Sequence, residues 1–133
     1  MKLTEYPYLN KTLAIIDACQ TDCEIDFSFN LPREFYDLTN PNNLKGLSIS
    51  KFVNDKFYFK LTHSNKQNLL ESLSTNFEDG EICHYTFYKD SMKIAEGYDH
   101  CELNFLNPEY FKLTDQHKEI LEDVEVEFTV TIA

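Results

Sequence analysis

The chain has 133 residues, a formal net charge of −11, and a composition that is 42% hydrophobic and 14% aromatic. This length predicts a single domain over residues 1–133, and the hydrophobic content argues against intrinsic disorder. A strongly acidic chain is repelled by nucleic acid and by anionic lipid, so direct binding to either is not expected.

A helix is expected first, over residues 7–19, with a strand over residues 12–18 as the alternative. Pro7 suits the first helical position. Apolar residues recur at helical spacing at Leu9, Leu13 and Ile16. Residues 24–31 then alternate between apolar and polar side chains, which is typical of a half-buried strand. The apolar face of this strand consists of Ile25, Phe27, Phe29 and Leu31.

Residues 46–62 are predicted to form a hairpin. A three-residue loop over residues 53–55 would place Ile49 opposite Phe59 and align the apolar faces of the two arms. A two-residue loop over residues 54–55 would place Ile49 opposite a lysine instead. The longer loop is therefore preferred.

A second helix follows, because Ser64 and Gln67 have the spacing of a capping box. Its apolar stripe consists of Leu69, Leu70, Leu73 and Phe77. Residues 81–88 and 92–98 are then predicted to form a second hairpin with its turn at residues 89–91.

The last part of the chain predicts a strand over residues 100–105, a short helix from Thr114 to Glu122, and a final strand in which Val124 to Ile132 alternate with polar residues. Hairpins dominate this order. The sequence therefore predicts an α+β fold, with a mostly antiparallel sheet of six or seven strands and two or three helices packed on one face.

The charge is unevenly distributed along the chain. Residues 1–77 carry nine acids and eight bases, whereas residues 78–133 carry fourteen acids and four lysines. Three carboxylates of the final strand, Asp123, Glu125 and Glu127, have strand spacing, so they are expected to point to one face at intervals of about 7 Å. We call them the acidic row. The alternative is a solvated face that only keeps an edge strand soluble.

A basic protein is the partner that such a surface favours. The residues predicted to bind it are Asp123, Glu125 and Glu127 of the acidic row, together with Glu122, Glu78, Asp79 and Glu81.

Two pairs of cysteines are candidate metal ligands. The set of Cys83, His84, His100 and Cys101 has the residue types of a zinc site, but the expected hairpin register does not bring the two dipeptides together. Cys19 and Cys23 are four residues apart, and no second pair has matching spacing. No metal and no other cofactor is therefore expected.

Signs of catalysis are weak. The three glycines are far apart, so no glycine-rich phosphate loop exists, and no nucleophile signature is present. Glu96, Asp99 and His100 form only a generic acid–base set. The aromatic residues that could line a ligand pocket are Tyr85, Phe87, Tyr98 and Phe105, although a filled aromatic core is the preferred interpretation. An enzyme is not expected, although a small-molecule-binding or enzymatic α+β domain remains the alternative.

The expected function is that of an acidic protein-binding module. An inhibitor or an immunity-type antidote would cover the basic site of a partner such as a toxin nuclease, and immunity proteins of bacterial toxin systems have this general character. The N-terminus lacks the features of a signal peptide, and the four cysteines are expected to be reduced, so a cytoplasmic location is predicted.

Overall fold

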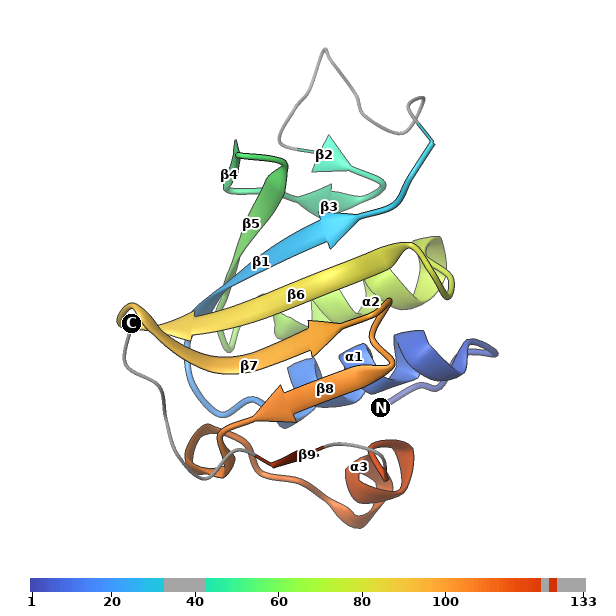
Figure 1. The fold of residues 1–133 in the computed structure, drawn as a ribbon, viewed down its shortest axis with the longest axis vertical. Helices are drawn as coiled ribbons and strands as arrows, with labels where there is room; N and C mark the ends of the chain where they lie inside the picture. The colour runs from blue at the N-terminus through green and yellow to red at the C-terminus, as the bar shows by residue number, and fades with distance from the viewer. Residues whose placement is uncertain (33–42, 123–124, 127–133) are drawn as a thin grey trace.

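The computed structural model describes residues 1–32, 43–122 and 125–126 (Figure 1). The elements in chain order are α1 (Pro7–Ala18), β1 (Cys23–Phe29), β2 (Asn43–Leu44), β3 (Leu47–Ser48), β4 (Lys51–Val53), β5 (Lys56–Leu61), α2 (Lys66–Asn76), β6 (Ile82–Lys89), β7 (Met92–Tyr98), β8 (Leu103–Leu106), the 3-10 helix η2 (Pro108–Tyr110), α3 (Asp115–Ile120) and β9 (Glu125–Val126).

One large sheet organises the fold, with the strand order β4-β5-β1-β6-β7-β8-β9. The first six strands pair antiparallel, and β9 adds to β8 in parallel. Strands β2 and β3 form a separate two-stranded ribbon. The predicted α+β fold with a mostly antiparallel sheet is confirmed. No helix in the described part of the chain is long and apolar enough to cross a membrane.

Helices α1 and α2 lie side by side against one face of the sheet, and α3 packs against α1 (Figure 1). Among the described residues no helix covers the opposite face, which we call the open face. The two faces therefore differ in their surroundings, and side chains that alternate along a strand enter either the core or the open face.

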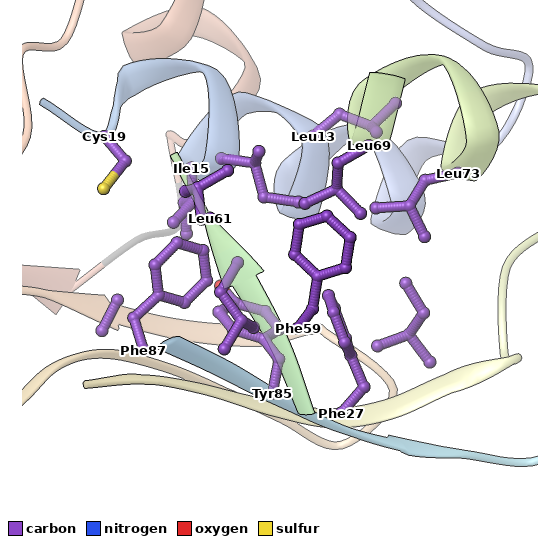
Figure 2. Packing of buried hydrophobic residues seen from close by; sticks show 14 of the residues in the cluster. Leu13, Ile15, Cys19, Phe27, Phe59, Leu61, Leu69, Leu73, Tyr85 and Phe87 are labelled. Atoms are coloured by element: carbon purple, nitrogen blue, oxygen red, sulfur yellow. The ribbon is translucent and has the colours of Figure 1, made fainter. Parts of the chain in front are cut away.

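The core lies between the two helices and the sheet, as Figure 2 shows. Leu13 and Ile15 come from α1, and Leu69 and Leu73 come from α2. They meet the central strands at Phe27, Tyr85 and Phe87, which are fully buried. Burying such large side chains contributes roughly 1.5–3 kcal/mol each to stability. The predicted inward faces of the first strand and of the second helix explain most of this packing.

Two predictions about the helices have different outcomes. The helix expected over residues 7–19 is confirmed as α1, and the alternative strand is wrong. The capping box at Ser64 is also wrong, because α2 begins after Asn65 and has no side-chain cap. The side chain of Asn65 instead fixes the preceding turn, accepting from the Thr62 amide at 2.8 Å and donating to the Lys60 carbonyl at 2.7 Å.

The predicted three-residue hairpin loop is wrong. Val53 pairs with Lys56, so the loop has two residues, Asn54 and Asp55, both with positive φ. Such a loop matches the twist of a hairpin. A three-residue loop would align the apolar faces only if one strand ran without interruption from residue 46. The chain instead bends at Ser50. Leu47 and Ile49 are therefore buried independently of the register between β4 and β5.

The second hairpin is confirmed, but the predicted three-residue turn at residues 89–91 is wrong. Lys89 pairs with Met92, so the turn consists of Asp90 and Ser91. The strand predicted over residues 100–105 begins only at Leu103, because three consecutive residues, Asp99, His100 and Cys101, adopt positive φ. The short helix after Thr114 is confirmed as α3. Of the predicted final strand, only residues 125–126 are described, and the rest of it lies outside the described residues.

Candidate functional site

The acidic row falls largely outside the described residues. Asp123 and Glu127 are not described, and only the backbone of Glu125 is placed, in parallel pairing with Phe105 of β8. Glu122, which precedes the row, is exposed. The row as a partner surface therefore stays a prediction.

The other three predicted partner-binding acids lie in the connection between α2 and β6, and each has an internal contact. Asp79 accepts a hydrogen bond from the Leu9 amide at 2.8 Å, which satisfies a free amide in the first turn of α1. Glu81 forms an ion pair with Lys45 at 2.7 Å and accepts from the Glu78 amide at 2.8 Å. Glu78 itself is exposed, with the Tyr6 hydroxyl 3.4 Å from its carboxylate. Asp79 and Glu81 thus contribute to folding.

Six other acids, which are all the acids between residues 99 and 122, are exposed and make no ion pair with any described residue. We call them the C-terminal acidic set: Asp99, Glu102, Glu109, Asp115, Glu119 and Glu122. They lie in the turn between β7 and β8, on η2, and on α3 and the residues that follow it. The charge asymmetry seen in the sequence is therefore present on the described surface as carboxylates without internal partners.

The most organised polar cluster lies on the open face around Glu96 of β7. One oxygen of Glu96 lies 2.9 Å from Nε2 of His84, and the other accepts from Lys93 at 3.0 Å and from the hydroxyl of Tyr98. Burial opposes ionisation of Glu96, but the hydrogen bonds from Tyr98, Lys93 and His84 outweigh it and lower its pKa. Glu96 is thus a buried carboxylate whose charge is neutralised locally.

The generic acid–base set predicted from the sequence does not assemble around Glu96. Asp99 and His100 lie in the exposed turn after β7, with positive φ. His84 takes the position beside Glu96, because the register pairs Thr86 with Glu96 and places the ring of His84 5.3 Å from that of Tyr98. Strand alternation could have identified His84 and Glu96 as residues of one face, given the correct register.

A second buried carboxylate, Asp26 of β1, also faces the open side. Asp26 pairs with Tyr58 on β5 and with Thr86 on β6. It is only 1% exposed, and its Oδ1 atom has no hydrogen-bond partner among the described residues. Burial raises the pKa of Asp26, and nearby Lys56 and His84 offset this only in part. The alternation of residues 24–31 predicted a solvated position here, so this burial was missed.

The backbones of the two dipeptides of the weak zinc candidates do meet, contrary to the expected register, because the His100 amide donates to the Cys83 carbonyl at 3.1 Å. Their side chains nevertheless do not converge. His84 binds Glu96 on the open face, whereas Cys101 is buried beneath the sheet beside the Ile82 carbonyl, at 3.5 Å from its sulfur. His100 is exposed in the β7–β8 turn. In the described part of the chain, no group of three or more His, Cys, Asp or Glu residues is placed to hold a metal ion.

Cys19 and Cys23 come together although they do not share a helix. Helix α1 ends at Ala18, and the chain turns so that the two sulfurs lie 3.9 Å apart. Cys19 is buried and Cys23 is half-buried. A hydrogen bond from Cys23 lowers the pKa of Cys19 to about 7, although burial opposes this. The same contact raises the pKa of Cys23.

The four aromatic residues considered for a pocket lie on opposite faces of the sheet and do not line a common cavity, and Tyr85 and Phe87 belong to the filled core that was the preferred interpretation. Tyr85 and Phe87 are fully buried under the helices, whereas Tyr98 is 36% exposed on the open face. A pocket of about 660 Å³ does occur where the start of β1 lies beside the ends of β5 and β6. Its lining includes Cys23, Tyr58, Tyr88, Lys51, Lys60 and Lys89.

Comparison with known proteins identifies no relative: no family model, no curated protein and no solved structure matches this chain.

Proposed function

We propose that this chain is an acidic protein-binding module that covers the basic site of a partner, as an inhibitor or immunity-type antidote covers a toxin nuclease. The single observation that carries the proposal is the C-terminal acidic set, whose six exposed carboxylates have no ion-pair partner in the described part of the chain. Unpaired like charges repel one another, and a basic partner would relieve that repulsion.

Apolar contact surface lies next to these charges. Tyr98 pairs with Leu103 across β7 and β8, and the two side chains are 36% and 46% exposed on the open face. The Tyr98 ring also meets Phe105 edge-on, with 5.4 Å between ring centroids. Asp99 and Glu102 belong to the turn that joins these strands. Exposed tyrosines are enriched at the centres of interfaces, and charged side chains such as these carboxylates are typical of the surrounding rim.

The mechanism is occlusion. Carboxylates of the C-terminal acidic set, extended by the acidic row, take the place of phosphates on the lysines and arginines of the partner. Complementary charge mainly accelerates association, with increases of about 10- to 10³-fold over uncharged encounters. Most exposed pairs at the rim contribute only roughly 0.2–1 kcal/mol each, so affinity depends on the desolvated centre.

Affinity capture tests the proposal. The full chain is immobilised and exposed to an extract of its source cells, and the bound proteins are eluted with a salt gradient and identified. The purified partner is then assayed for nuclease activity with and without this chain. The expected result is a basic protein that elutes with rising salt and loses activity at one equivalent.

A control separates specific capture from general charge attraction. Two variants each remove three negative charges: Glu109→Gln, Glu119→Gln and Glu122→Gln in the C-terminal acidic set, or Glu5→Gln, Asp55→Asn and Glu71→Gln elsewhere. All six carboxylates are exposed. Only the first variant should lose the partner. Equal retention by both variants, or a partner that keeps its activity when bound, would refute the proposal.

A further inference from the structure

A pair of thiols lies outside the surface assigned above, where α1 passes into β1. The sulfurs of Cys19 and Cys23 are 3.9 Å apart. Figure 2 shows Cys19 at the end of α1, at the edge of the core. Cys23 is half-buried and is one of the residues that line the pocket of about 660 Å³, whereas Cys19 is buried, so Cys23 is the more accessible of the two. A disulfide bond is about 2.0 Å long, so the sulfurs need to approach by only about 2 Å to form one.

The surroundings of this pair favour reaction. The ammonium group of Lys66 donates to the carbonyl of Cys19 at 2.5 Å and to that of Asp17 at 3.1 Å, which places a positive charge beside the thiols. With the pKa of Cys19 at about 7, the pair carries one thiolate and one shared proton in a large fraction of molecules at neutral pH. Thiolates, rather than thiols, attack disulfides.

The second pair of cysteines offers a comparison within the same chain. Burial raises the pKa of Cys101 to about 12 and also raises that of Cys83. Both groups are therefore protonated at neutral pH and react slowly. The difference between the two pairs follows from their surroundings and not from their spacing in the sequence.

We propose that Cys19 and Cys23 form a dithiol site that low-molecular-weight disulfides oxidise to an intramolecular disulfide. Cys23 attacks one sulfur of the reagent as its proton passes to Cys19, which forms a mixed disulfide and releases one thiolate. The sulfur of Cys19 then loses that proton and attacks Cys23, which releases the second reagent half as a thiol. The protein loses two electrons and one reagent molecule gains them.

The disulfide itself would add little to the stability of the fold. The disulfide would close a loop of five residues, from Cys19 to Cys23, and short loops give the least stabilisation. The Cys19 backbone nevertheless pairs with Phe111, and Lys66 connects it to α2. Oxidation would therefore change the junction of α1, α2 and the segment leading to α3, while the core stays in place.

The experiment uses the full chain, incubated with oxidised glutathione at neutral pH and quenched with an alkylating reagent. Free thiols are counted, and disulfides are located by peptide mass mapping. The reduced protein has four free cysteines. The expected result is a loss of two, with a bond between Cys19 and Cys23. Cys19→Ser should slow the reaction, because no thiolate accepts the proton of Cys23, and should stop it at a glutathione mixed disulfide on Cys23. Cys23→Ser should not react, because the remaining thiol of Cys19 is buried.

Cys83→Ser is the matched control, because it removes one cysteine of the unreactive pair and should leave the reaction unchanged. Circular dichroism checks that each variant is folded. Four free thiols in the treated wild type, a mixed disulfide that persists on its Cys23, or a bond that involves Cys83 or Cys101 would each overturn the proposal.

Discussion

Gly97 is a residue whose identity the packing fixes. It lies opposite Tyr85 across β6 and β7, and a Cβ atom added there would lie 2.1 Å from the Tyr85 ring. That ring cannot move away easily, because it is fully buried and its hydroxyl donates to Oδ1 of Asn104 at 2.6 Å. Asn104 in turn donates to the Cys101 carbonyl at 2.7 Å. A tyrosine, an asparagine and a glycine thus form one unit inside the core.

We predict that Gly97→Ala destabilises the fold by about 3 kcal/mol or more, because overpacking displaces the Tyr85 ring. Urea denaturation followed by circular dichroism measures the change. Gly80→Ala is the control: a Cβ there meets nothing within 4 Å, although φ is +88°. Its expected cost is about 1–2 kcal/mol from backbone strain alone. A loss for Gly97→Ala no greater than that for Gly80→Ala would contradict the packing account.

Asp26 gives a pH-dependent prediction. Its pKa is raised in the folded state, mainly by burial, so the folded protein binds more protons than the unfolded one between the two pKa values. Its contribution to stability therefore falls as pH rises from the unfolded pKa, near 3.9, through the raised folded value. Lys56, His84, Tyr88 and Glu96 are the titratable groups around it.

We predict that the stability of Asp26→Asn relative to the wild type increases over that pH window and is constant above it. Denaturation at a series of pH values from 3 to 7 measures the difference. Asp55→Asn, at an exposed turn position, is the control and should show a smaller change. A difference for Asp26→Asn that stays flat across the window would mean that burial does not govern this carboxyl.

At the scale of elements, α3 depends on one buried histidine. Nε2 of His117 lies 2.7 Å from Oδ2 of Asp17 on α1, and its Nδ1 atom accepts from the Thr114 amide at 3.1 Å. The Thr114 hydroxyl accepts from the His117 amide at 3.2 Å, which completes a capping box. A helix of six residues has little stability of its own, so these contacts determine whether it forms.

We predict that His117→Ala costs about 1–3 kcal/mol, because it leaves the half-buried carboxylate of Asp17 without this partner and removes a buried ring. Amide hydrogen exchange should accelerate in α3 and leave the central strand β6 unaffected. Lys118→Ala changes the exposed neighbour on the same helix and should remain within about 0.5 kcal/mol of the wild type. Equal effects of the two substitutions would contradict the anchoring role of His117.

The elements that the sequence predicted well are those with one periodic apolar face. The spacing of apolar residues located α1, and strict alternation located β1. The register between β4 and β5 was not predictable in this way, because the bend at Ser50 separates Leu47 and Ile49 from the strand that follows. The approach of Cys19 to Cys23 was not predictable for a similar reason. It depends on the path of the turn after α1, and the spacing of apolar residues does not reveal that path.

For the candidate site too, some features could be predicted from the sequence and others could not. Charge composition indicated an acidic C-terminal part, and the exposed C-terminal acidic set agrees with that. Composition could not show which acids form contacts inside the folded chain. Asp79 satisfies an amide of α1, and Glu81 pairs with Lys45. Asp26 and Glu96 are buried on a face that alternation assigned to solvent, because neighbouring side chains on the open face cover them.

At the scale of the whole molecule, the proposed function requires that the negative charge act at one surface. A net charge of −11 spread evenly would act mainly on solubility, and any three carboxylates would then be equivalent. A docking surface makes them unequal, because pairs formed near the contact act at shorter range and are less screened by salt. The central claim is therefore a claim about where on the chain the charge acts.

Stopped-flow association with the captured partner at low and high salt tests this claim most directly. The variant of Glu109, Glu119 and Glu122 and the variant of Glu5, Asp55 and Glu71 have the same net charge. We predict that the first slows association at low salt by ~10-fold and flattens its salt dependence, while the second stays close to the wild type. Equal on-rates for the two variants at low salt would show that the acidic surface serves solubility alone.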